Sequence, residues 1–279
     1  MKYYSEPEAR ALVLKAGREL LQTELVARTW GNISARISDT EFIITPSGRD
    51  YETLTPAELV KVKISDLSYA GSIKPSSETG IHADAYALRK DVNFIIHTHQ
   101  LYASAVGVEN EDLSFAPCAG YGLPGSATLR RAVCNVIAAN RDSRTFLMTK
   151  HGALCLGENF EDAFRLAREL EENCKAAFIA RTGVHSTEQI VPVCCQNRPS
   201  LPAYIDDFAQ LVGPCAAIKG GVIQTPDTDN AEAVRLIVRK NCAAALYARK
   251  AKPLSIPDAA LQRMIYLTKY SKQKEKNRK

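Results

Sequence analysis

Apolar side chains along the chain follow helical spacing in some segments and strand-like spacing in others. A capping box, Ser5-Glu6-Pro7-Glu8, precedes residues 9–25, where apolar side chains recur at helical spacing. The same spacing predicts helices over residues 78–89, 101–106, 129–140 and 160–180. Short β-branched runs predict strands over residues 33–37, 41–45, 60–64, 94–99, 145–148 and 153–157. Because strands and helices mix without a strict βαβ repeat, we expect an α/β sandwich with a mixed or largely antiparallel sheet.

The pattern weakens after His185, where prolines punctuate a looser segment. We therefore place a boundary near residue 195, with a catalytic domain over residues 1–195 and a C-terminal extension over residues 196–279. Lys219-Gly220-Gly221 parallels Lys150-His151-Gly152, which suggests that the extension is a degenerate partial repeat of the preceding strand and helix. Gly220 would then take the place of His151, and chance similarity is the alternative.

Composition narrows the class of protein. The chain is 46% hydrophobic and 24% charged, as in globular proteins, and no apolar run approaches the ~20 residues of a membrane span. The first seven residues lack the apolar stretch of a signal peptide, so we expect a cytoplasmic protein whose eight scattered cysteines are reduced. Much of the net charge of +5 lies in Lys269–Lys279. No aromatic residue alternates with the run of charges from Lys272, so we expect a solvated terminus and no nucleic-acid or membrane partner.

Histidines at the ends of predicted strands are the main chemical signal. His97 and His99 are separated by one residue, so a strand directs both imidazoles to the same face. Alone, this pair fits a metal site or a hydrogen-bonded pair about equally. His151 also ends a predicted strand and precedes Gly152, which lets the backbone approach closely. Three histidine ligands with a fourth position open are the pattern of a catalytic zinc ion, although Mn²⁺ and Co²⁺ also accept imidazoles.

Polar turns add a possible base and an anion site. Glu78 lies at the start of a predicted helix, where the helix dipole favours its ionised form. Beside a metal ion this carboxylate can act as a base, and without one it is an ordinary helix-start glutamate. The turns at Gly31-Asn32, Ser47-Gly48 and Ser76-Ser77 offer hydroxyl, amide and backbone N–H donors that suit a phosphate group. Spacing alone does not place them together.

Five motifs in one order carry a family resemblance over roughly residues 8–182. They are Trp30-Gly31-Asn32-Ile33-Ser34, Thr45-Pro46-Ser47-Gly48, Pro75-Ser76-Ser77-Glu78, His97-Thr98-His99 and Lys150-His151-Gly152. The chain resembles the class II aldolase/adducin family, and in general layout its fuculose-phosphate aldolase branch. The resemblance implies a three-layer α/β/α sandwich with a mixed, largely antiparallel central sheet, assembled as a homotetramer.

The resemblance also implies roles for individual residues. It implies one zinc ion per chain on His97, His99 and His151, with Glu78 as catalytic acid/base. Gly31, Asn32, Ser47, Gly48, Ser76 and Ser77 match the phosphate-binding positions. Tyr121 matches a tyrosine that reaches a neighbouring subunit's site as a proton donor, and otherwise reads as an interface aromatic. Two departures are Gln100, where the family often has serine, and Phe115-Ala116, where the epimerase branch has an aspartate.

The expected function is a zinc-dependent aldolase, which is a lyase of carbohydrate metabolism. It would reversibly cleave a phosphorylated ketose to dihydroxyacetone phosphate and an aldehyde. The alternatives are a zinc-dependent dehydratase or decarboxylase of a sugar phosphate, and a non-catalytic adducin-like binding module. The sequence does not specify the sugar.

Overall fold

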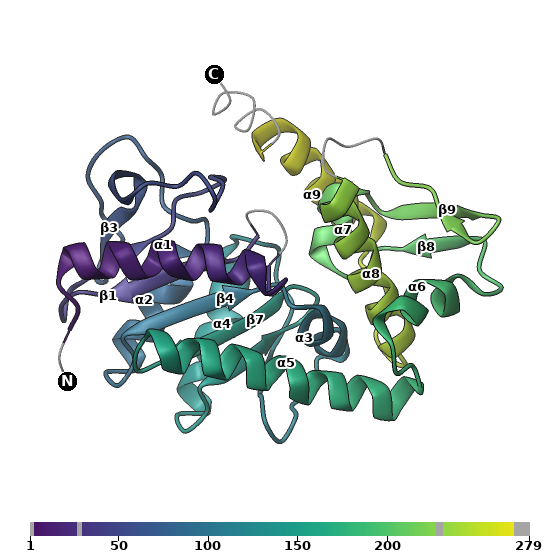
Figure 1. The fold of residues 1–279 in the computed structure, drawn as a ribbon, viewed down its shortest axis with the longest axis horizontal. Helices are drawn as coiled ribbons and strands as arrows, with labels where there is room; N and C mark the ends of the chain where they lie inside the picture. The colour runs from purple at the N-terminus through teal and green to yellow at the C-terminus, as the bar shows by residue number, and fades with distance from the viewer. Residues whose placement is uncertain (1–2, 27–29, 227–230, 271–279) are drawn as a thin grey trace.

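The computed structural model describes residues 3–26, 30–226 and 231–270 (Figure 1). Its first part contains, in chain order, α1 (Glu6–Gln22), β1 (Asn32–Arg36), β2 (Glu41–Ile44), η1 (Pro56–Glu58), β3 (Val60–Lys63), α2 (Thr79–Leu88), β4 (Phe94–Thr98), α3 (Leu101–Val106), η2 (Gly107–Glu109), β5 (Cys118–Ala119), α4 (Ala127–Ala139), β6 (Thr145–Met148), β7 (Gly152–Gly157) and α5 (Phe160–Thr182).

The central sheet has seven strands in the order β3-β2-β1-β4-β7-β6-β5. Every neighbouring pair is antiparallel except β5 and β6, which are parallel. Strands β4 and β7 form the middle of the sheet, with Thr98 opposite Ala153 at the end that carries the predicted histidines. His97, His99 and His151 therefore meet where β4 ends and β7 begins, at one end of these two middle strands.

Alternation along the strands divides the interior into two hydrophobic cores. On β4, Phe94 and Ile96 join the core beneath α1, α3 and α5, whereas Ile95 joins the core beneath α2 and α4. This period of two is expected for strands buried on both faces. The result is a sheet between two helical layers, so the predicted three-layer α/β/α sandwich with a mixed, largely antiparallel sheet is confirmed.

The C-terminal part forms a smaller unit that packs against one end of the sandwich (Figure 1). It contains α6 (Thr187–Cys195), β8 (Ser200–Pro202), α7 (Asp206–Leu211), β9 (Cys215–Lys219), β10 (Val222–Ile223), α8 (Ala231–Tyr247), α9 (Ile256–Ile265) and η3 (Tyr266–Tyr270). Its three strands form a separate antiparallel sheet in the order β10-β9-β8. Helix α8 lies against α3, and Phe208 and Ile237 belong to the same hydrophobic core as α1 and α5. The extension therefore shares a core with the sandwich.

The proposed partial repeat in the C-terminal extension has a counterpart in the order of helices and strands. The hairpin of β9 and β10 precedes α8, just as the hairpin of β6 and β7 precedes α5. Gly220, which aligns with His151, lies in an exposed hairpin turn with a φ angle of 57°, whereas in the other turn the positive φ angle of 62° belongs to Lys150, one position earlier in the alignment. A common origin of the two segments stays a prediction.

Among the described residues, no helix combines the length and the apolar composition needed to cross a membrane. The basic run Lys272–Lys279 lies outside the described residues, so its expected solvated state stays a prediction.

Gly152 makes the close approach of β7 to β4 possible. A Cβ atom added to Gly152 would lie 2.2 Å from the backbone oxygen of Thr98, far inside van der Waals contact. We expect Gly152→Ala to lower the free energy of unfolding by at least about 2 kcal/mol, because backbone must shift to admit the methyl group. Gly120→Ala is the matched control, since a Cβ there meets no atom within 4 Å. Urea denaturation of both variants checks this, and equal stabilities would contradict it.

Glu171 on α5 should make stability depend on pH. Its carboxylate oxygens accept hydrogen bonds from the backbone N–H groups of Tyr102 and Ala103, at 2.8 and 3.0 Å. Burial outweighs these bonds and raises the pKa of Glu171 from 4.5 to about 7. The folded state therefore holds a proton that the unfolded state releases, so the stabilisation is full below pH 4.5 and is lost as the pH rises through 7.

Comparison with Glu171→Gln isolates this effect, because glutamine does not titrate. We expect the unfolding free energy of the parent chain, relative to the variant, to fall by about 1 kcal/mol or more between pH 5 and pH 8. Denaturant titrations across that range measure the difference. A constant difference across the range would disprove the assignment.

Candidate metal centre

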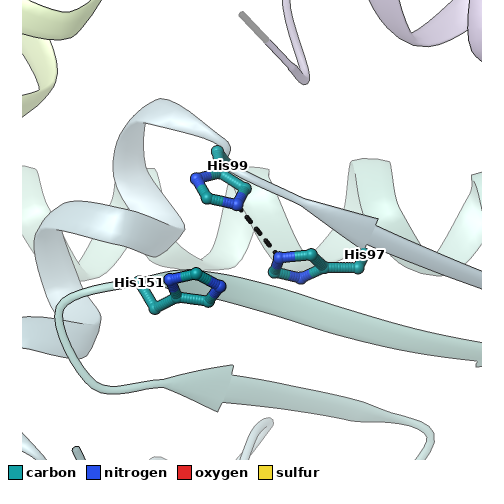
Figure 2. Close-up of side chains that lie close together, drawn as sticks. All are labelled: His97, His99 and His151. Carbon is teal, nitrogen blue, oxygen red and sulfur yellow. Dashed lines mark hydrogen bonds between the residues drawn. The ribbon is translucent and has the colours of Figure 1, made fainter. Parts of the chain in front are cut away.

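Three imidazoles converge at the end of β4 and the start of β7 in the central sheet, as Figure 2 shows. The residues His97, His99 and His151 are 1%, 5% and 3% exposed. Their candidate ligand atoms all lie within 4.8 Å of one another. His97 sits on β4, His99 follows its last residue, and His151 lies in the turn before β7. The prediction that the three residues meet is confirmed.

The hydrogen bonds of the Nδ1 atoms fix how each ring faces the centre. Nδ1 of His97 donates to the carbonyl of Ala153 at 2.8 Å, and Nδ1 of His99 donates to Asp207 at 2.6 Å. Nδ1 of His151 donates to Asp206 at 3.0 Å. Each ring therefore directs Nε2 inward. Such outer partners are typical of metal-binding histidines, because they set the tautomer and the orientation of the ring.

The spacing of the Nε2 atoms suits a cation. Those of His97 and His99 lie 3.0 Å apart. Two nitrogens bound tetrahedrally to zinc at ~2.0–2.1 Å stand ~3.3 Å from each other. Burial lowers the pKa of His97 to about 3 and also lowers the pKa of His99, so both rings are neutral. With each Nδ1 proton donated outward, the two Nε2 lone pairs lie close together, an arrangement that a cation between them stabilises.

His151 shows the same preference for positive charge. Burial opposes its protonation, but Glu78 and Asp206 on either side outweigh burial and raise the pKa of His151 to about 10. A divalent cation on Nε2 satisfies these carboxylates in place of the proton. The three histidines thus fit a metal ion by their donor atoms, their spacing and the charge around them.

Glu78 lies directly beside the converging nitrogens. Its Oε1 is 2.8 Å from Nε2 of His151, and its Oε2 is 3.2 Å from Nε2 of His97. Burial opposes ionisation, but His97, His151 and a hydrogen bond from Asn32 hold the pKa of Glu78 well below its usual range. Glu78 immediately precedes α2, at the predicted helix start. Its carboxylate makes no capping hydrogen bond to the helix and instead contacts the side chains of His97, His151 and Asn32. The carboxylate is placed to touch either a metal ion or a substrate bound to it.

His82 supports Glu78 indirectly. Nε2 of His82 is 2.5 Å from Oδ1 of Asn32, whose Nδ2 donates to Glu78 at 2.8 Å. Nδ1 of His82 is 2.7 Å from the hydroxyl of Ser34. His82 is fully buried and does not belong to the group of three histidines. It is a packing histidine that also orients Asn32.

Thr45 ties the three polar turns together. Its hydroxyl accepts from the backbone N–H of Ile33, next to Gly31-Asn32, and its carbonyl accepts from the N–H of Ser76. Pro46 forms a β-bridge with Pro75, which sets the segment at Ser47 and Gly48 beside the segment at Ser76 and Ser77. The serines are partly or fully exposed, whereas Asn32 is buried and engaged with Glu78. Whether these positions bind phosphate stays a prediction.

The phenol of Tyr121 is hydrogen-bonded to two residues of the C-terminal extension. Its hydroxyl donates to Asp206 at 3.3 Å and accepts from Nε2 of Gln262 at 3.1 Å. Burial and the nearby carboxylates raise the pKa of Tyr121, so the hydroxyl keeps its proton. Through Asp206 the phenol is connected to His151. Its predicted approach to a neighbouring subunit stays a prediction.

The extension contributes residues that the sequence reasoning missed, namely Asp206, Asp207, Lys240 and Gln262. Asp206 and Asp207 are 0% and 1% exposed and lie about a hundred residues from His99 along the chain. Two adjacent acids among apolar residues in Tyr204-Ile205-Asp206-Asp207-Phe208 were the available signal. That signal does not say which groups the acids contact.

Comparisons with known proteins give one consistent result. The family model described as "Class II Aldolase and Adducin N-terminal domain" matches residues 11–178. The chain is 34% identical over 171 residues to a 5-methylthioribulose-1-phosphate/5-deoxyribulose-1-phosphate aldolase of Escherichia coli, covering 57% of this chain and 78% of that protein. It is 28% identical over 191 residues to a 3-oxo-tetronate 4-phosphate decarboxylase of Pectobacterium atrosepticum, covering 63% of this chain and 86% of that protein.

Solved structures agree on the fold. An L-fuculose 1-phosphate aldolase matches with a TM-score of 0.59 and 27% identity, over 64% of this chain and 88% of that chain. An L-fuculose 1-phosphate aldolase from Glaciozyma antarctica covers 97% of this chain and 96% of its own, with a TM-score of 0.54. At 13% identity the second match shows the fold alone, and it extends over the C-terminal part as well.

Proposed function

The chain belongs to the class II aldolase and adducin family and is a lyase, and from this premise we propose that it reversibly cleaves a phosphorylated ketose. The products are dihydroxyacetone phosphate and an aldehyde. The observation that carries this proposal is the convergence of three inward-facing Nε2 atoms beside the ionised carboxylate of Glu78.

His97, His99 and His151 hold the metal ion in this proposal, with Zn²⁺ as the ion of choice for three imidazoles and an open position. When bound, the ion supplies Lewis-acid stabilisation of the negative charge that develops on the substrate oxygens, worth several kcal/mol. The arrangement also suits Mn²⁺ or Co²⁺, because both accept imidazole ligands.

The other residues of the site then bind the substrate and move protons. In the synthetic direction the ionised carboxylate of Glu78 removes a proton from C3 of dihydroxyacetone phosphate, and in the cleavage direction it returns that proton to the same carbon. Asn32 holds Glu78 in place by its hydrogen bond. Tyr121, protonated at rest, donates its proton to the aldehyde oxygen in the synthetic direction, and the proton held by Glu78 then returns to Tyr121 through solvent. In the cleavage direction the same transfers run in reverse, so Tyr121 takes the proton of the C4 hydroxyl.

The phosphate group of the substrate binds at the three turns gathered around Thr45. Donors come from Gly31, Asn32, Ser47, Gly48, Ser76 and Ser77. The exposure of the serines and the contacts that join their turns to the segment at Thr45 and Pro46 support this assignment.

The homotetramer, the cytoplasmic location and the domain boundary at residue 195 are further predictions of the same proposal. The shared core supports an extension that belongs to the catalytic unit.

Product analysis tests the proposal. The chain is incubated with a panel of ketose 1-phosphates that includes L-fuculose 1-phosphate and 5-deoxyribulose 1-phosphate, with and without a chelator. We expect dihydroxyacetone phosphate and an aldehyde to appear only without the chelator. Absence of both fragments from every ketose, in a chain loaded with metal, would refute the aldolase assignment.

A decarboxylase is the second candidate, because a decarboxylase of a sugar-acid phosphate is among the relatives. The same metal site and Glu78 serve the loss of CO₂ from a 3-oxo acid phosphate. Release of CO₂ from such a substrate separates this reaction from aldol cleavage, and a dehydratase leaves a single carbon fragment. The binding-module alternative finds no support, because the three histidines and Glu78 are all in place.

A further inference from the structure

Two adjacent carboxylates of the extension hold two different histidines of the metal centre. Asp206 and Asp207 are the first two residues of α7, and each accepts a hydrogen bond from a different Nδ1 atom. Neither carboxylate is reachable by solvent, with side chains 0% and 1% exposed. Burying two adjacent acids is costly unless each is paired. Their partners therefore indicate what the acids are for.

Asp207 is paired on both of its oxygens. Oδ1 accepts from Nδ1 of His99 at 2.6 Å, and Oδ2 accepts from Nζ of Lys240 on α8. Lys240 is itself 4% exposed, and its Nζ also donates to the backbone oxygen of His99 at 2.9 Å. The lysine thus balances the charge of Asp207 and ties His99 to α8 by its backbone as well.

Asp206 is equally well satisfied. Oδ2 accepts from Nδ1 of His151, and Oδ1 accepts from Nε2 of Gln262 at 2.7 Å and from Tyr121 at 3.3 Å. Its backbone N–H donates to the carbonyl of Lys150 at 2.9 Å, next to the histidine that it holds. The carboxylate is fixed from three sides.

Asn241 fixes the start of α7 that carries both acids. Its Oδ1 accepts from the backbone N–H groups of Tyr204 and Ile205 at 2.7 and 3.3 Å, and its Nδ2 donates to the carbonyl of Pro202. Adjacent residues of α8, Lys240 and Asn241, therefore hold Asp207 and the backbone before it. Of the three histidines, only His97 takes its Nδ1 partner, the carbonyl of Ala153, from the sandwich itself.

We propose that the C-terminal extension completes the metal centre, with Asp206 and Asp207 as positioning residues that set the tautomer and ring orientation of His151 and His99. Lys240 keeps Asp207 ionised and in place. The inference rests on the proposed metal site and adds that its affinity depends on residues beyond 195. Removing an outer partner of a metal-binding histidine typically weakens metal affinity 10–100-fold.

The test measures the Zn²⁺ dissociation constant of the full-length chain by competition with a chelating dye, and the visible spectrum of the Co²⁺-substituted chain. The variants are Asp206→Asn and Asp207→Asn, which keep side-chain shape and remove the charge. Glu171→Gln is the matched control, because the carboxylate of Glu171 accepts hydrogen bonds from the backbone N–H groups of Tyr102 and Ala103 and, among the described residues, from no side chain of the metal centre. Thermal unfolding of each chain without added metal reports fold stability separately.

We expect each aspartate variant to bind Zn²⁺ 10–100-fold more weakly and to change the Co²⁺ spectrum, with the control within twofold of the parent chain. If Asp207→Asn does not fold because Lys240 is left unpaired, Asp207→Asn with Lys240→Met removes both charges and carries the same expectation. Aspartate variants within twofold of the parent affinity would overturn the proposal and leave the proposed function standing. A parent chain that binds no metal would instead overturn the metal site itself.

Discussion

Glu78→Gln is expected to lower turnover of the phosphorylated ketose by about 10²–10⁴-fold while the chain keeps its metal. Glutamine preserves the size of the side chain and an acceptor for Asn32, but it can neither take up nor return a proton at the reacting carbon. The three imidazoles are unchanged, so metal content should stay near one ion per chain. Steady-state kinetics and elemental analysis of the same preparation measure both quantities.

Glu171→Gln serves as the control, because it also replaces a carboxylate that accepts two backbone hydrogen bonds, and no hydrogen bond among the described residues joins Glu171 to the three histidines or to Asn32. Turnover of the control should stay close to that of the parent chain. Unchanged turnover in Glu78→Gln with full metal content would remove Glu78 from the proton transfer. Loss of metal together with turnover would assign Glu78 to metal binding instead.

His151→Ala is expected to abolish both metal retention and turnover. Only two imidazoles remain after the change, and the affinity for Zn²⁺ should fall on the order of 10³-fold, since losing even an outer partner costs 10–100-fold. The change also leaves Glu78 and Asp206 facing the space that the imidazole filled, without the positive charge between them. Dialysis against a dilute chelator followed by elemental analysis measures retention.

His185→Ala is the matched histidine control. His185 is exposed and follows α5, outside the group of three histidines. Its replacement should alter neither metal content nor turnover. Full metal content in His151→Ala after the same dialysis would show that His151 is not a ligand.

The convergence of the three histidines was largely predictable from sequence, because His97 lies on β4, His99 directly follows β4 and His151 directly precedes β7, next to each other in the middle of the sheet. The strand-like period of two places His97, on β4, and His99, just after it, on one side. Gly152 lets β7 approach β4 so closely that a Cβ atom at this position would clash with the backbone oxygen of Thr98. Local periodicity also predicted the helices on both faces of the sheet. Element ends differed by a few residues, as with α1, which runs from Glu6 to Gln22 instead of over residues 9–25.

The outer part of the site was not predictable, because it depends on contacts between distant segments. Asp207 meets His99 across 108 positions and Lys240 across 33, and no periodic pattern encodes either pairing. The gathering of the three polar turns likewise depends on Thr45 and on the bridge between Pro46 and Pro75. The spacing of residues along the chain does not predict such contacts. The prolines at the start of the extension indicated a looser segment, whereas the extension shares a hydrophobic core with the sandwich.

The most direct test of the central claim is a metal titration of the chelator-treated chain, followed by analysis of products from a ketose 1-phosphate that the parent chain cleaves. We predict that cleavage to dihydroxyacetone phosphate and an aldehyde rises with added Zn²⁺ and saturates at one ion per chain. The same titration of His97→Ala should give no saturating site. Full cleavage by a chain that holds no metal, or saturation at one ion in His97→Ala, would contradict the assignment of the three histidines as the catalytic metal site.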